Sequence, residues 1–144
     1  MNEAQAAMFH HPVTRNFFRS TILRDTPAAM KCLANDVTVQ ASFFPETVVG
    51  IENIPQSFEA FVNVCDRIEI ERVFHDGPYT GVKMKIFFGE FVLDGLDYTH
   101  QNEEGLIDQL LVMWRPLESI LAFRNAMFTK MGVPHQKLVS EDAA

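Results

Sequence analysis

The side chain with the clearest chemical potential is the carboxyl group of Asp97, which interrupts an otherwise apolar, strand-like segment. Alternation along this segment places Asp97 on the same face as Phe91 and Leu93. Burial among apolar groups disfavours the charged form of a carboxyl group and raises its pKa. A neutral carboxyl group could donate a hydrogen bond to a developing oxyanion, or transfer protons for an isomerase or cyclase. The alternative is a structural role in an ion pair or a turn, because such carboxyl groups also serve the fold.

Apolar side chains from one helix and two strands are predicted to line a pocket beside Asp97. They are Phe58, Met84, Leu110, Val112 and Trp114. Thirteen phenylalanines against one tryptophan and two tyrosines indicate an aromatic interior that could enclose a ligand cavity. Dense packing of the same side chains is the alternative. If the cavity exists, its partner is predicted to be a hydrophobic small molecule.

Charge and composition exclude several other partners. Lys and Arg number 12 and Asp and Glu number 19, which gives a net charge of −7. Binding of nucleic acid needs clustered basic residues, and the sequence shows pairs rather than patches. Anionic membrane surfaces are disfavoured for the same reason. No apolar run approaches the ~20 residues that span a bilayer, and no signal-peptide pattern is present, so we predict a cytoplasmic protein.

The two cysteines, Cys32 and Cys65, lie in helical apolar patterns without a neighbouring histidine. This arrangement is typical of buried thiols rather than of a zinc site. The adjacent His10 and His11 would point in different directions from the start of a helix. We therefore predict neither a metal nor a cofactor.

The elements that must position Asp97 are three apolar runs separated by short polar turns, over residues 82–88, 91–98 and 106–114. Their spacing predicts consecutive antiparallel strands. Two further strands are predicted over residues 37–42 and 67–74, and a short extended piece over 47–49. Helices are predicted from Pro12 over three turns, from Thr26 as a cap to Ala34, from Asn53 in a capping box with Gln56, and over residues 116–131.

Helices early in the chain followed by a long meander indicate an α+β protein. The 144 residues suit one domain, with its core over residues 10–131 and mobile ends over 1–9 and 133–144. Both faces of the meander are apolar in places. Leu96, Tyr98, Leu111 and Met113 share the face away from Asp97, and monomers rarely expose such a patch. We therefore predict a homodimer that pairs this outer face with its copy.

Three short segments carry a resemblance to a known superfamily: Asp36–Val39, Gly50–Ile54 and Glu104–Ile107. In this order the chain resembles the nuclear transport factor 2-like superfamily, and within it the SnoaL-like, polyketide cyclase and ketosteroid isomerase-type branch. The resemblance covers about residues 10–131. It implies a cone-shaped α+β barrel, in which a strongly curved, mostly antiparallel sheet wraps three helices, with an extra C-terminal helix here.

The resemblance to ketosteroid isomerase also bears on individual positions. The protonated aspartate of that enzyme corresponds to Asp97, its tyrosine to Phe17, and an aromatic residue of the last strand to Trp114. Its aspartate base corresponds to Ala41, which cannot accept a proton. Gln40 and Ser42 flank that position and could orient a ligand or a water molecule, although neither is a base at neutral pH.

Two functions follow from these expectations. One is a cofactor-independent isomerase, cyclase or lyase that acts on a hydrophobic carbonyl or polycyclic compound through Asp97. The other is a non-catalytic module for ligand binding or dimerisation. The retained Asp97 favours the first, and the missing base favours the second.

Overall fold

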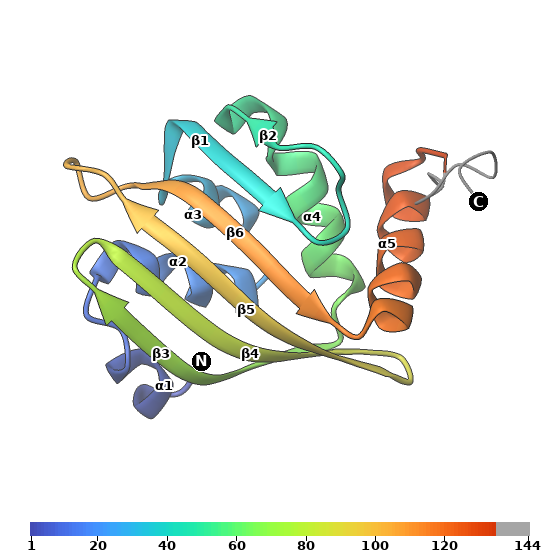
Figure 1. The fold of residues 1–144 in the computed structure, drawn as a ribbon, viewed down its shortest axis with the longest axis horizontal. Coiled ribbons are helices and arrows are strands. Elements are labelled where there is room, and N and C mark those ends of the chain that lie inside the picture. Colours follow the sequence, from blue (N-terminus) through green and yellow to red (C-terminus); the bar gives the residue numbers. More distant parts are fainter. Residues whose placement is uncertain (135–144) are drawn as a thin grey trace.

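The computed structural model describes residues 1–134 and shows an α+β fold built on one six-stranded mixed sheet. The strands lie side by side in the order β2-β1-β6-β5-β4-β3 (Figure 1). The helical elements are α1 Glu3–Ala7, α2 Pro12–Ile22, α3 Thr26–Met30, the 3₁₀ turn η1 Ile51–Asn53, α4 Pro55–Val64 and α5 Leu117–Met131. The strands are β1 Leu33–Ala41, β2 Val48–Val49, β3 Arg67–Asp76, β4 Tyr79–Phe88, β5 Phe91–Gln101 and β6 Ile107–Arg115.

The predicted meander is confirmed, and two of its strands, β4 and β5, are longer than the apolar runs alone suggested. Strands β4 and β5 pair from Phe88 opposite Phe91 to Tyr79 opposite His100. Gly89 turns the chain between them with φ of 53°, a backbone conformation that favours glycine. Its N–H donates to the Asp66 carboxylate at 2.7 Å. The strands extend beyond the apolar runs because backbone pairing continues wherever the partner strand continues.

Strand β1 joins the sheet by running parallel to β6, with Val39 opposite Leu110 and Ala41 opposite Val112. This parallel pair brings residues far apart in the sequence side by side at the middle of the sheet. Helices α2, α3 and α4 lie together on one face of the sheet, and α5 stands at one end (Figure 1). The sheet and these helices enclose the core.

The first residues of the chain are folded onto the domain, where the sequence predicted a mobile end over residues 1–9. Asn2 and Gln5 form a capping box that starts α1. The Gln5 side-chain amide donates to the Ile70 carbonyl at 3.1 Å, which ties α1 to the edge strand β3 (Figure 1). Phe9 is buried and stacks on Phe18 with 5.6 Å between ring centroids. Apolar burial therefore anchors this segment.

Two predicted helix starts are also corrected. The cap of α3 is Asp25 rather than Thr26, because the Asp25 carboxylate accepts from the Ala28 N–H at 3.0 Å. Asn53 does not cap α4, and its side-chain amide donates to the Val49 carbonyl instead.

Helix α3 ends at Met30, four residues earlier than predicted, and β1 begins at Leu33. The Ile107 N–H donates to the Cys32 carbonyl at 2.9 Å, so pairing with β6 takes over from the helix. Both cysteines are buried and free, as predicted. No helix in residues 1–134 is long and apolar enough to cross a membrane. The predicted mobile tail from 133 onward lies almost entirely outside the described residues.

Candidate functional site

A cavity of about 80 Å³ lies between the inner face of the sheet and the helices. Seven of the nine residues predicted for the site line it: Phe17, Phe58, Met84, Asp97, Leu110, Val112 and Trp114. Strand pairing explains this convergence, because alternate residues of adjacent strands point to the same face of a sheet. Helices α2 and α4 supply the two phenylalanines from the opposite side.

The half-buried members of the lining show where the cavity is least covered. Val39 and Val48 belong to β1 and β2, Phe44 lies in the loop between them, and Ser57 and Phe61 belong to α4. Ala41 of β1, Ile22 of α2 and Ile68 of β3 are half-buried as well, and the rest of the lining is buried. The cavity is therefore least covered at two places, one at the β1–β2 segment and α4, and one at Ile22 and Ile68.

Asp97 is the one charged side chain in this apolar surface. It is 7% exposed, and its cross-strand partners on either side are Val82 and Val112. Burial raises the pKa of the carboxyl group from 3.8 to about 7, because the charged form loses its hydration, while the hydrogen bond from Trp114 acts in the opposite direction. The carboxyl group is therefore balanced between its neutral and charged forms near neutral pH.

The indole of Trp114 provides the polar contact of Asp97. Its Nε1–H donates to Asp97 Oδ1 at 3.3 Å. The backbone of Trp114 is fixed by Ser42, whose hydroxyl group accepts from the Trp114 N–H at 2.9 Å and donates to the Val112 carbonyl at 3.1 Å. The indole packs against Phe43, Phe61 and Phe123, with ring centroids 5.2 to 5.5 Å away. The donor is thus held between a tethered backbone and an aromatic cluster.

Gln40 and Ser42 do not line the cavity, so their predicted role as ligand contacts is corrected. Val39 and Ala41 line the cavity from β1, and strand alternation places Gln40 on the opposite face. The Gln40 amide donates to the Thr47 hydroxyl at 3.2 Å. Ser42 lies just beyond the end of β1, and its hydroxyl group is bonded to the backbone of β6.

Two hydroxyl groups in the cavity wall were missed by sequence reasoning. Thr21 Oγ1 donates to the Phe17 carbonyl at 2.8 Å, and Ser57 Oγ donates to the Ile54 carbonyl at 3.1 Å. Because each hydrogen atom is used within its own helix, both groups offer acceptor lone pairs to the cavity. The available signal was helical spacing, since Thr21 lies four residues after Phe17 on the same face of α2.

Asp97 is the only titratable side chain among the described residues that line the cavity. Within residues 1–134, no group of three or more His, Cys, Asp or Glu side chains is arranged to hold a metal ion. The chemistry available here is therefore that of one carboxyl group, one indole N–H and two hydroxyl acceptors in an apolar enclosure.

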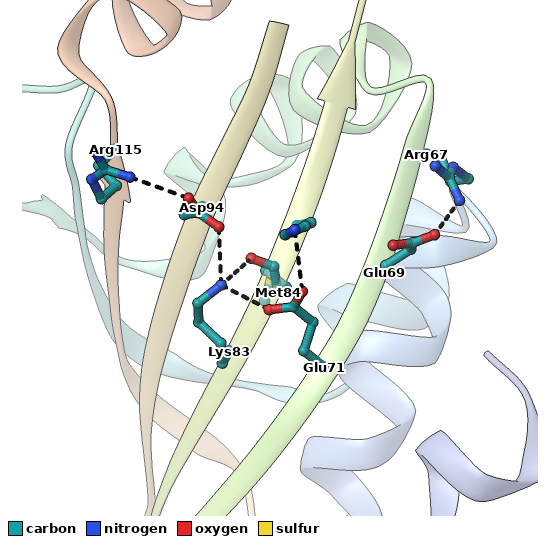
Figure 2. Close-up of polar contacts among 8 residues, drawn as sticks. Arg67, Glu69, Glu71, Lys83, Met84, Asp94 and Arg115 are labelled. Atoms are coloured by element: carbon teal, nitrogen blue, oxygen red, sulfur yellow. Dashed lines mark hydrogen bonds and ion pairs between the residues drawn. The ribbon is translucent and has the colours of Figure 1, made fainter.

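The opposite, outer face of the sheet combines exposed apolar side chains with ion pairs. Leu96 is 37% exposed and Met113 is 47% exposed, and they are cross-strand partners. Beside them, Lys83 bridges Glu71 and Asp94, and Arg115 also contacts Asp94 (Figure 2). The outer face thus carries an exposed apolar pair bordered by charges, and the homodimer through this face stays a prediction.

Comparison with solved structures gives several close matches. An uncharacterised protein with a cystatin-like fold from Silicibacter pomeroyi DSS-3 matches with a TM-score of 0.80, at 23% identity over 84% of this chain and 86% of that chain. A steroid delta-isomerase from Pseudomonas aeruginosa matches with a TM-score of 0.72, at 20% identity over 90% of each chain.

A third match is SalBIII, an epoxide hydrolase/cyclase-like enzyme of pyran ring formation in the polyether salinomycin. Its TM-score is 0.63, at 17% identity over 79% of this chain and 93% of that chain. The sequence itself matches no protein-family model and no curated protein.

Proposed function

On the nuclear transport factor 2-like fold that this chain shares with its structural neighbours, we propose that the cavity under the sheet binds a small, largely apolar compound. The compound carries a carbonyl or hydroxyl oxygen that contacts Asp97. The observation that carries this proposal is the placement of a single buried carboxyl group, bonded to Trp114, in an otherwise apolar cavity. Ligand sites commonly combine apolar walls with a few convergent polar groups.

The size of the cavity narrows the ligand class. A dry apolar cavity of about 150 Å³ is known to bind benzene, and drug-sized ligands occupy about 300 to 1,000 Å³. The cavity here measures about 80 Å³. This is about half the volume of the cavity that binds benzene, so a compound with one small ring would require a modest widening of the cavity. A polycyclic compound would require a much larger one. We also propose that the sheet is cone-shaped and strongly curved, because such a sheet would supply the concave wall of the cavity.

The second candidate function is proton transfer by Asp97, in an isomerase, cyclase or lyase without a cofactor. It is favoured by one observation, the pKa of Asp97 of about 7, because a general acid or base works best near its own pKa. One carboxyl group can take a proton from carbon and return it to another position. The names of two structural neighbours, a steroid isomerase and a cyclase-like enzyme, agree with this chemistry.

Binding can be tested through Trp114, the only tryptophan of the chain, which lines the cavity. Titration with cyclopentanone, cyclohexanone and a steroid ketone is expected to change its fluorescence in that order of decreasing affinity. Ala41→Leu, which places a larger side chain in the cavity wall, should weaken the response of the two small ketones at least tenfold. Asp94→Asn on the outer face should leave the response unchanged. A flat titration for all three ketones would rule out the pocket.

Catalysis needs a separate measurement. Exchange of the α-protons of cyclohexanone in D₂O, followed by proton NMR, reports proton abstraction next to a carbonyl group. The natural chain is expected to accelerate this exchange, with a rate that rises as Asp97 ionises, and Asp97→Asn should abolish the acceleration. Binding without accelerated exchange would leave the chain a non-catalytic ligand-binding module.

We also propose that the chain forms a homodimer through the outer face of the sheet. An exposed apolar pair on a sheet, Leu96 with Met113, is the kind of surface that pairs with its own copy. Tyr98 and Leu111 are cross-strand partners next to it and enlarge the patch. Gel filtration with light scattering is expected to give twice the chain mass of 16.4 kDa. Met113→Glu should convert the dimer to a monomer, and a natural chain that is already monomeric would contradict the pairing.

A further inference from the structure

Gly95 lies where the indole of Trp114 crosses β5. It is the cross-strand partner of Trp114 and points to the same face as Asp97, two residues later. A Cβ atom on residue 95 would lie 2.9 Å from Trp114 Nε1, 3.0 Å from Trp114 Cδ1 and 3.1 Å from Met84 Cγ. Real Cβ atoms do not tolerate the shortest of these separations, so any side chain here would displace the indole.

This close approach puts the indole N–H within reach of Asp97. With nothing but backbone beneath it, the ring lies low over β5, and Nε1 comes to 3.3 Å from Asp97 Oδ1. A shift of the Trp114 ring would break its packing contacts with Phe61 and Phe123, and Ser42 holds the backbone of Trp114 in place. A lifted indole would therefore lose its contact with the carboxyl group.

We propose that Gly95 is a positioning residue for the cavity carboxyl: its missing side chain lets the Trp114 indole lie across β5, orient Asp97 and stabilise its ionised form. The consequence for a bound compound rests on the proposed function, whereas the contact itself needs no ligand. The absence of a side chain at Gly95 thereby permits the hydrogen bond from Trp114 to Asp97.

The surroundings of Asp97 make this single contact decisive. Its cross-strand partners Val82 and Val112 are apolar, and the described cavity wall holds no other titratable group. The two hydroxyl groups of the described cavity wall, on Thr21 and Ser57, donate to the carbonyls of Phe17 and Ile54. The indole N–H is therefore the donor that opposes the effect of burial on the pKa of Asp97.

The test is a pH titration of the unliganded full chain by NMR. It follows the ¹³C side-chain carboxyl resonance of Asp97 and the single indole N–H resonance. Gly95→Ala is expected to raise the titration midpoint of Asp97 by roughly one pH unit, the size expected for losing one hydrogen bond to a charged group. The indole resonance should lose its dependence on that midpoint. Trp114→Phe, which removes the donor itself, should raise the midpoint by a similar amount.

Gly81→Ala is the matched control. Gly81 lies in β4 of the same sheet, and its added Cβ would meet Phe74 Cδ2 at 3.2 Å, away from the cavity. This variant should leave the midpoint of Asp97 unchanged. An unshifted midpoint in folded Gly95→Ala would overturn the proposal, as would an equal shift in the Gly81→Ala control.

If Gly95→Ala alone does not fold, Trp114→Leu provides space for the added methyl group. Equal midpoints for Trp114→Leu with and without Gly95→Ala would support action through the indole, and a further shift would overturn it. Whether the chain binds the ketones is measured separately from the titration midpoints of Asp97. A natural chain that ignores ketones but shows the Gly95→Ala shift would refute ligand binding and leave the positioning role intact.

Discussion

Asp94 and Asp97 lie three residues apart on the same strand, and their carboxyl groups have opposite properties. On the outer face, Asp94 accepts from Lys83 Nζ at 3.2 Å and from Arg115 Nη1 at 3.3 Å (Figure 2). The hydrogen bond from Lys83 lowers the pKa of Asp94. On the inner face, no charged group among residues 1–134 pairs with Asp97, and burial raises its pKa to about 7.

The contrast teaches that the pleat of the strand decides the chemistry of each carboxyl group. An odd separation along a strand places two side chains on opposite faces. One of these faces meets water and lysine, and the other meets apolar side chains. The same residue type therefore becomes a surface carboxylate with a lowered pKa at position 94 and a buried carboxyl group with a raised pKa at position 97.

The largest expected effect comes from Asp97→Asn. The pKa of Asp97 is higher in the folded chain than its ordinary 3.8, so the folded state retains a proton that the unfolded chain releases. The natural chain therefore loses stability as pH rises from about 4 to 7. Because Asn does not ionise, the variant should exceed the natural chain in free energy of unfolding by on the order of 3 to 5 kcal/mol above pH 7. Urea denaturation at pH 4, 6 and 8 measures the difference.

The urea measurement at pH 4 is the internal control for the Asp97→Asn prediction. Near pH 4 the Asp97→Asn variant and the natural chain should have nearly equal stability, because Asp97 is then protonated when folded. A difference of equal size at all three pH values would indicate a packing effect and would contradict the titration.

A smaller and opposite effect is expected from Lys83→Met on the outer face. Without its lysine partner, the pKa of Asp94 should rise toward the ordinary value. The ion pair contributes up to about 1 kcal/mol at pH 7, because pairs that are partly exposed to water are weak. This contribution is present above the ordinary carboxyl pKa and is lost as pH falls through the lowered pKa of folded Asp94.

Urea denaturation at pH 7 and pH 2.5 measures the Lys83→Met effect. The loss of stability should appear at the higher pH and vanish at the lower one. Equal destabilisation at both values would mean that the lysine contributes through its aliphatic stem rather than its charge. Arg67→Met is a matched control, because it removes a cation of the edge strand β3 that is not paired with Asp94. This variant should leave the titration of Asp94 unchanged.

The smallest expected effect is that of salt. At 1 M NaCl the Debye length falls to about 3 Å, which screens exposed charges more than buried ones. NMR titration should show the midpoint of Asp94 moving up by roughly a few tenths of a pH unit, because the attraction of its cations is weakened. The midpoint of Asp97 should stay within error. A salt-sensitive Asp97 would mean that water reaches it in the folded chain.

Much of the fold could be predicted because apolar periodicity and turn residues are local signals. The meander, helices α2 and α5, and the nuclear transport factor 2-like fold are confirmed. The packing of residues 1–9 onto the domain was not predicted, because it depends on contacts outside the segment itself, Gln5 on Ile70 and Phe9 on Phe18. The dimer and the cytoplasmic location stay predictions.

The candidate site also contains residues that local sequence signals predict and residues whose role depends on tertiary contacts. Asp97 and six apolar liners were predicted from strand alternation, helix periodicity and the family resemblance, and all seven meet at the cavity. Gln40 does not line the cavity because it flanks inward positions of β1 and faces away from them, and Ser42 lies just beyond the end of that strand. Ser42 instead holds Trp114 in place, and the importance of Gly95 depends on a cross-strand neighbour that no sequence pattern reveals.

The sequence by itself determined the strands, their faces and the presence of one carboxyl group among apolar side chains, because these depend on neighbours in the chain. Only the tertiary structure decided that the Trp114 indole is the donor to Asp97 within the described part of the chain, that the pKa of Asp97 is about 7, and that the cavity beside it is small. The physical reason is that hydration and hydrogen bonding at a buried group are set by what packs around it. Those neighbours come from β4, β6 and the helices, and they meet only when the chain is folded.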